Sequence, residues 1–108
     1  MKISDIKALE AFECLQSEYA DAEVFAGYTS DLLSDVMANA DEGSVLITIQ
    51  AHKNTVAVAS LVGIVAIVVC NGRTVADDML DAAKREGIAV FGTEGNQFDT
   101  SVLIANHM

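Results

Sequence analysis

Two polar clusters interrupt the apolar middle of this 108-residue chain, and both follow runs of β-branched residues. They are Gln50-Ala-His-Lys-Asn54 and Cys70-Asn-Gly-Arg73, and they hold the only basic side chains between residues 8 and 83. Each cluster precedes a segment expected to be helical. The free N–H groups and positive dipole end of a helix start attract anions. Together with two bases, they predict a site for a phosphate or carboxylate group.

In this hypothesis Lys53 and Arg73 supply charge, Asn54 and Asn71 orient the ligand, and Gly72 lets the backbone approach it. An alternative interpretation is that both clusters are ordinary strand-to-helix turns, in which Asn54 caps a helix and Asn71-Gly72 turns the chain. The sequence leaves both open. The expected ligand-binding residues are Gln50, His52, Lys53, Asn54, Asn71, Gly72, Arg73 and Thr93.

Catalytic chemistry has weaker support than ligand binding. The chain lacks the glycine-rich loops that bind nucleotide phosphates. Its histidines and cysteines lack the spacing of metal ligands, and nothing in the sequence identifies a cofactor. Cys70 ends an apolar run near several bases, which could lower its pKa and make it a thiol sensor. A buried Cys at such a position is more often a small apolar side chain. We therefore expect no enzyme activity and no metal site.

The hydrophobic pattern predicts short strands and helices in alternation. The spacing between the second and third strands is the length that a crossover helix needs, so 55–62 is expected to be helical. The predicted strands are Val24–Tyr28, Val45–Gln50, Ile64–Cys70 and Ile88–Phe91.

Three more helices are expected from capping and apolar spacing. The first follows Ser4, with Ile6, Leu9 and Phe12 on one side and Cys14 packed on it. A second runs from Ser30 to Asn39, with Leu32, Leu33, Val36 and Met37 facing inward. Another follows Arg73, with Thr74 as N-cap and Gly87 as its end. A closing helix is expected over Asn96–His107.

This order predicts a single α/β domain over residues 1–108, a three-layer sandwich with a mainly parallel sheet flanked by helices. Ligands bind beyond the carboxyl ends of parallel strands. Both polar clusters and the turn Thr93-Glu-Gly-Asn96 should lie at that edge.

The charge balance excludes several classes of function. Sixteen acidic residues against six basic ones give a net charge of −10, which argues against nucleic acid and anionic membranes as partners. Residues 54–72 carry no charge, but polar and glycine residues make this run shorter than a membrane span. Two distant cysteines and no visible signal peptide fit a cytoplasmic protein.

Three segments resemble a stand-alone DRTGG domain, a family similar to the N-terminal domain of HPr kinase/phosphorylase. They are 27-GYTSDLLSDVMAN-39, 46-LITIQAH-52 and 56-VAVAS-60. Of the family's name-giving residues only Gly72 is matched. His52-Lys53 and Cys70-Asn71 replace the others. The resemblance implies a regulatory or binding module without the kinase activity of the longer relatives. It also favours the interpretation of the two polar clusters as a ligand site.

We therefore expect a non-catalytic regulatory domain, forming a homodimer, that senses a small nucleotide- or phosphate-like anion or contacts a partner such as a kinase or redox enzyme system. The alternative is an adaptor without a small ligand, which meets a basic partner through its acidic N-terminal face. Asp31, Asp35, Asp41 and Glu42 motivate that alternative.

Overall fold

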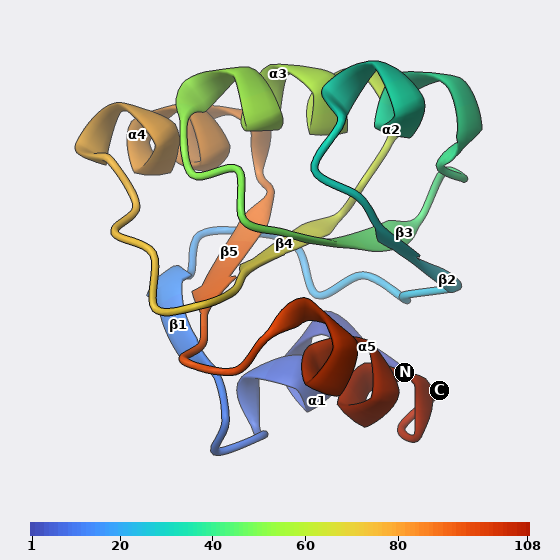
Figure 1. The fold of residues 1–108 in the computed structure, drawn as a ribbon. Helices are drawn as coiled ribbons and strands as arrows, with labels where there is room; N and C mark the ends of the chain where they lie inside the picture. Colours follow the sequence, from blue (N-terminus) through green and yellow to red (C-terminus); the bar gives the residue numbers. More distant parts are fainter.

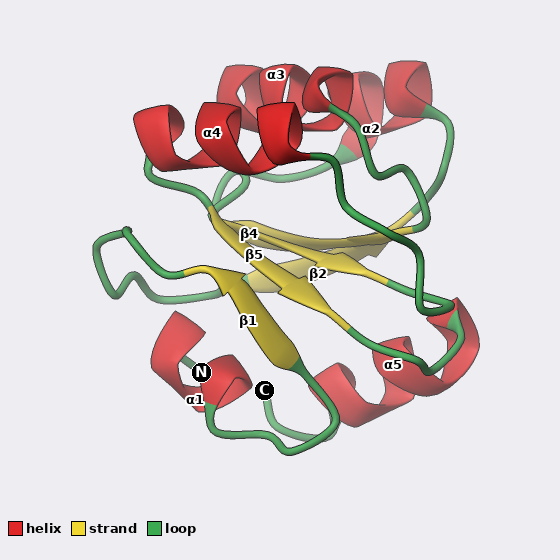
Figure 2. Cartoon of the chain, turned by 90° about the vertical axis from the view of Figure 1, so that its left-hand side faces the viewer, coloured by secondary structure: helices red, strands yellow, loops and turns green.

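The computed structural model describes residues 1–108, and its five-stranded sheet lies between two layers of helices (Figures 1 and 2). The strand order is β1-β5-β4-β3-β2, and only β1 is antiparallel to its neighbour. The predicted α/β three-layer sandwich with a mainly parallel sheet is confirmed. The strands are β1 (Glu13–Gln16), β2 (Ala26–Thr29), β3 (Ser44–Thr48), β4 (Ala66–Val69) and β5 (Ala89–Gly92).

The helices divide unequally between the two faces. The upper layer in Figure 1 holds three helices, and the lower layer holds α1 and α5 near the two chain ends. Strands β2 to β5 follow one another in both sequence and space, so their right-handed crossovers place all three connecting helices on one face. The helices are α1 (Ile3–Lys7), α2 (Leu33–Asn39), α3 (Lys53–Val62), α4 (Asp77–Glu86) and α5 (Gln97–Ala105).

The core consists of two apolar clusters, one on each side of the sheet. Every residue of β3 and β4 is buried, as the uninterrupted apolar run in β4 predicts for a strand covered on both faces. Phe91 faces the lower cluster with Ile3 and Ile6, whereas Ile67 faces the upper cluster with Met79. The charge-free middle of the sequence thus forms the centre of the fold. No helix has both the length and the apolar character that crossing a membrane needs.

Several predicted element boundaries are wrong. Strand β1 was not expected, and Cys14 lies in it rather than on the first helix. Helix α1 ends at Lys7, so Leu9 and Phe12 reach the core from a turn. The physical reason is that β1 is short and half exposed, which leaves no alternation for a sequence pattern to detect.

The upper helices also differ at their N-termini. Helix α4 begins after Ala76, so Thr74 does not cap it, and His52 rather than Asn54 occupies the N-cap position of α3. Helix α2 begins at Leu33, three residues later than Ser30. Its Leu32 and Met37 are 64% and 48% exposed instead of facing inward. The predicted end of α3 at residue 62 and that of α4 at Gly87 are confirmed, because Gly63 and Gly87 adopt left-handed conformations that end the helices.

Candidate functional site

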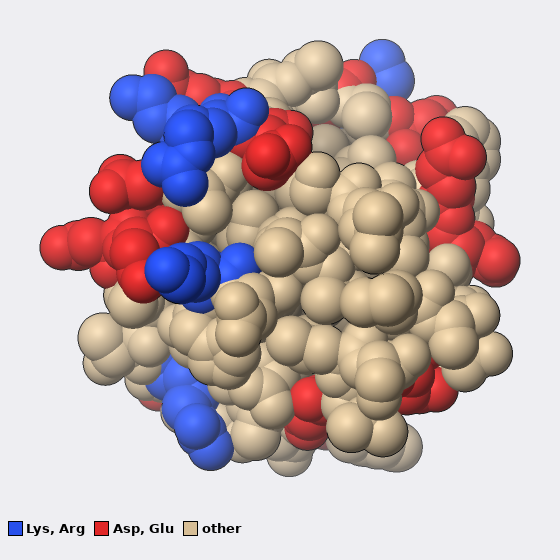
Figure 3. Space-filling view, turned by 90° about the horizontal axis from the view of Figure 1, so that it is seen from above, with Lys and Arg blue, Asp and Glu red and all other residues tan.

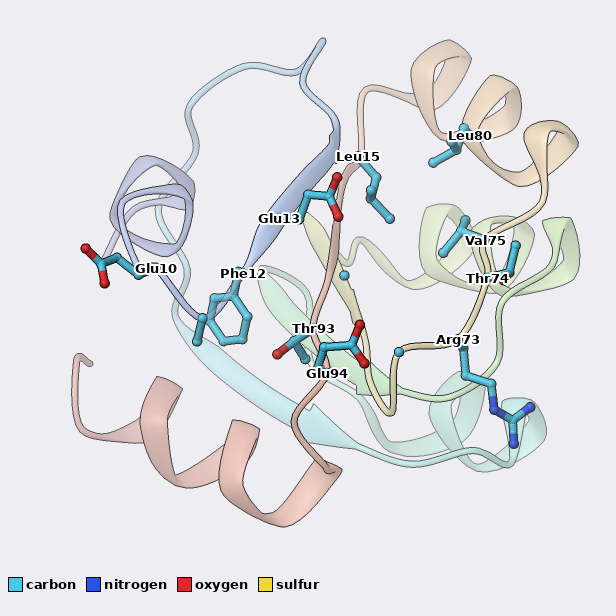
Figure 4. Close-up of a pocket in the computed structure, with 13 residues that line it drawn as sticks. Glu10, Phe12, Glu13, Leu15, Arg73, Thr74, Val75, Leu80, Thr93 and Glu94 are labelled. Atoms are coloured by element: carbon cyan, nitrogen blue, oxygen red, sulfur yellow. The ribbon is translucent and has the colours of Figure 1, made fainter.

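A groove of about 370 Å³ opens where β4 and β5 end (Figure 4). The chain leaves β4 for α4 in the upper layer but leaves β5 for α5 in the lower layer. Neighbouring parallel strands whose connections diverge in this way open a crevice at their carboxyl ends, which is where α/β folds bind ligands. The groove lies at the end of β5, between the loop that leaves β4 on one side and β1 with the turn before it on the other.

The groove is lined by apolar, polar and charged residues, and three of its four charged residues are acidic. Arg73 is its only basic residue, and in Figure 4 the guanidinium points away from the labelled carboxylates. Neither Arg73 nor any of the carboxylates forms an ion pair. The apolar side chains are Phe12, Leu15, Val75 and Leu80, and the carboxylates are Glu10, Glu13 and Glu94.

One side of the groove is a tightly held turn after β4. Asn71 and Gly72 both adopt left-handed backbone conformations, with φ of 63° and 62°. The Asn71 N–H donates to the Gly95 carbonyl over 2.9 Å, and the Gly72 N–H donates to the Thr93 carbonyl over 2.8 Å. A side chain on Gly72 would overlap the Glu94 carboxylate. Gly72 was expected to let a ligand approach the backbone, but the Glu94 side chain lies there instead. The N–H groups of Asn71 and Gly72 are already bonded, so they are not free to receive an anion.

The other end of the carboxyl edge is organised around Asp31, which follows β2. Its Oδ1 accepts hydrogen bonds from Thr48 Oγ1 and the Ile49 N–H, each 2.9 Å long, and from Gln97 Nε2 over 3.0 Å. Gln50 Nε2 donates to the Asp31 carbonyl over 2.9 Å. Asp31 was expected on a solvated acidic face, but it ties β2, β3 and α5 together. Its position two residues after β2 placed it at the carboxyl edge, but no pattern in the sequence showed that its partners lie within the fold.

The turn from β3 into α3 presents the remaining predicted residues. Gln50 Oε1 lies 2.9 Å from His52 Nε2, while His52, Lys53 and Asn54 are exposed. The first turn of α3 contains no acidic residue, in contrast to Asp77 and Asp78 at the start of α4. Lys53 forms no ion pair. This helix start therefore keeps the positive end of its dipole and an un-neutralised ammonium group.

The predicted residues fall into two groups on one edge. Gly72, Arg73 and Thr93 line the groove, whereas the other predicted residues, Gln50, His52, Lys53 and Asn54, lie in the turn into α3. Asn71 is exposed in the loop between them. Sequence reasoning missed the groove carboxylates and Asp31, and no group of His, Cys, Asp or Glu is arranged to hold a metal ion.

Cys70 is not suited to be a reactive thiol. It is fully buried, and its Sγ lies 3.5 Å from Thr100 Oγ1. Burial raises the pKa of the Cys70 thiol, and the charge of Asp31 raises it further, against a smaller opposing effect of the Thr100 hydrogen bond. The expected lowering by nearby bases is wrong, because the thiol faces the lower core and not the exposed bases.

The acidic N-terminal face has fewer free carboxylates for a basic partner than the sequence led us to expect. Asp35 accepts a 2.8 Å hydrogen bond from the Tyr28 hydroxyl and a 2.9 Å hydrogen bond from Asn39. The Tyr28 hydrogen bond, with Ser30 and Asn39, lowers the pKa of the Asp35 carboxyl. Of the four acids that motivate the adaptor hypothesis, Asp41 and Glu42 remain exposed and without hydrogen bonds through their side chains.

Comparison with known proteins identifies a shared fold. No protein-family model and no curated protein matches the chain. A similar solved structure is the regulatory region of Clostridium perfringens pyrophosphatase, comprising CBS and DRTGG domains in complex with the activator diadenosine tetraphosphate. The TM-score is 0.66 at 17% identity, over 86% of this chain and 41% of that chain. The chain therefore has a fold found within a CBS and DRTGG regulatory region, and spans less than half of that region.

Proposed function

We propose that this chain is a non-catalytic regulatory domain of the DRTGG type, which senses a small anionic ligand at its carboxyl edge. The observation that carries the proposal is the start of α3, where Lys53 lies in a first turn without acidic residues. Arg73 lies on the same edge after the adjacent strand β4, and no carboxylate neutralises either base. In a chain with a net charge of −10, such a place attracts a phosphate group where the rest of the surface repels it.

The shared fold supports this proposal. The similar region in the pyrophosphatase regulates that enzyme and binds diadenosine tetraphosphate, a nucleotide. A nucleotide-like ligand here would place a phosphate near Lys53 and Arg73, with His52, Asn54 and Asn71 as exposed polar groups around it. We infer that ligand occupancy is passed to a regulated partner, such as a kinase or redox enzyme.

Calorimetric titration with inorganic phosphate, adenosine monophosphate and diadenosine tetraphosphate tests the ligand class. The double variant Lys53→Ala with Arg73→Ala should lose most of the affinity for whichever of these binds. A matched control is Lys7→Ala with Arg85→Ala, which makes the same charge change on exposed bases outside the proposed site. Equal affinities of the two double variants would refute the site, and no binding of any titrant by the wild type would refute the ligand class.

The alternative function, an adaptor for a basic partner, is favoured only by Asp41 and Glu42, since Asp31 and Asp35 are engaged in hydrogen bonds. Its complex should weaken as salt concentration rises, because exposed charge pairs are screened. A complex captured equally well at low and high salt would exclude this adaptor.

A further inference from the structure

The two outer edges of the sheet differ in how they are protected from another strand. On β1 the register shifts between Cys14 and Gln16, and the charged residue Glu13 begins the strand. Strand β2 pairs with β3 in continuous register from Ala26 to Thr29 and contains no charged residue. Bulges and charges are the usual protection of a free edge. The β1 edge has both, and β2 itself has neither. The start of the chain pairs only with the segment before β2, through the Lys2–Glu23 bridge, and leaves residues 26–29 open.

An apolar stripe lies beside the open β2 edge in the lower layer. A 2.7 Å hydrogen bond between Thr29 Oγ1 and Ser101 Oγ holds α5 against β2. Phe98, Val102 and Ala105 follow helical spacing on the exposed side of α5 next to Ser101. Phe98 is 76% exposed and Val102 is 45% exposed. An exposed aromatic side chain beside an unpaired strand is typical of a surface that becomes covered.

Charge indicates what covers this surface. Copies of a chain with a net charge of −10 repel one another over most of their surfaces, so they can meet closely only where charge is absent. Asp35, above β2, already accepts hydrogen bonds from Tyr28 and Asn39. A basic partner would be drawn instead to the exposed acids elsewhere. An uncharged strand edge with an adjoining apolar stripe therefore favours a second copy of this chain.

We propose that the β2 edge is a self-association surface, at which two copies pair their β2 strands antiparallel across a two-fold axis normal to the sheet. This axis keeps the lower layers of both copies on the same side, so the Phe98 and Val102 stripe meets its symmetry mate. The dimer is closed and has one continuous ten-stranded sheet, since each copy supplies five strands. It is independent of the ligand proposal, because it uses a side edge and leaves the carboxyl edge free.

The test compares two exposed apolar positions. The double variant Phe98→Glu with Val102→Glu places charges in the proposed interface. The control Leu61→Glu alters a residue that is 71% exposed on α3. Helix α3 belongs to the upper layer, and the centre of the molecule seen from above carries no charged side chain (Figure 3). Sedimentation equilibrium should give twice the 11.4 kDa chain mass for the wild type and the control. The double variant should raise the dimer dissociation constant about tenfold or more, with circular dichroism unchanged.

Hydrogen exchange supplies a second measurement that needs no variant. The amides of residues 26–29 should become more protected as wild-type concentration rises, and rising salt should tighten the dimer by screening the net charge. The proposal is overturned by a wild type that stays monomeric, by a mass that grows without limit, or by a dimer that only Leu61→Glu dissociates. A dimer with unchanged exchange in β2 overturns it as well.

Discussion

The two halves of the carboxyl edge use their polar side chains in opposite ways. Around Asp31, carboxylate, amide and hydroxyl groups bond to one another and join β2, β3 and α5. Beyond β4 and β5, by contrast, Arg73 and Glu94 form no ion pair and line an open groove. The difference teaches that the position of a polar residue after a strand does not separate structural from functional roles. The two roles are separated by whether the hydrogen-bond partners of the residue lie within the fold.

Removal of the Asp31 carboxylate is the severest test of this contrast. Asp31→Ala should lower the free energy of unfolding by about 2–4 kcal/mol, because three donors lose a charged acceptor and the fully buried Thr48 hydroxyl loses its partner. Urea denaturation measures the loss. Asp81→Ala on the exposed side of α4 is the control, with a change within about 0.5 kcal/mol. Equal stability of the two variants would show that the network does not hold the edge.

The groove side can be tested at its tight turn. Gly72→Ala should destabilise the fold by about 1 kcal/mol through left-handed strain, because the exposed Glu94 carboxylate that it would meet ends a flexible side chain and can move aside. Gly87→Ala is the matched control: Gly87 has a similar φ of +67° and open space around it, so a similar cost of about 1 kcal/mol is expected there. Denaturation midpoints measure both.

The double variant Gly72→Ala with Glu94→Ala tests whether the Glu94 side chain is free to move. Removing the Glu94 side chain should leave the cost of Gly72→Ala unchanged and close to that of Gly87→Ala. A cost that falls clearly when Glu94 is removed would show that Glu94 is held in place against Gly72.

Cys70 should behave as part of the core below both halves of the edge. A thiol probe should label the half-exposed Cys14 in the native state and Cys70 only after unfolding. Mass spectrometry of digested peptides distinguishes the two sites. If Cys70 were labelled in the native state at a rate similar to that of Cys14, Cys70 would be an accessible and reactive thiol after all.

The raised pKa of Cys70 also predicts a direction of pH dependence. The folded state keeps a proton that the unfolded thiol releases near about pH 8.5, so the stabilising contribution is complete below that pH. It is lost as the pH rises through the higher folded-state pKa. The stability difference between wild type and Cys70→Ala should therefore shrink in alkaline urea titrations.

The smallest expected effect concerns Asp35, a half-buried residue of α2 that is bonded to Tyr28 and Asn39. The Tyr28 hydroxyl lowers the pKa of its carboxyl, so this contribution is present above the unfolded value of about 3.9 and is lost as the pH falls through the lower folded value. Tyr28→Phe should move the NMR titration of the Asp35 carboxyl to higher pH. Tyr19→Phe, whose tyrosine does not contact Asp35, should leave it unchanged.

Much of the secondary structure could be predicted because it depends on local patterns. The apolar run ending at Cys70 identifies a doubly covered strand, and Gly63 and Gly87 mark helix ends through their left-handed conformations. Strand β1 could not be predicted, since its four residues pair through a bulge with β5, far away in the chain. The exposure of Leu32 and Met37 could not be predicted either, because the spacing of apolar residues on a short helix does not show which side packs against the sheet.

By itself, the sequence determined the alternation of strands and helices, and thereby the placement of Lys53 and Arg73 after successive parallel strands. Hydrophobic period and turn chemistry are local properties, so a single chain displays them directly. Only the tertiary structure decided that Asp31 is bonded within the fold, that the groove is lined by carboxylates, and that β2 is an open edge. These features depend on strand order and on which face each connection takes, and contacts between distant segments set both.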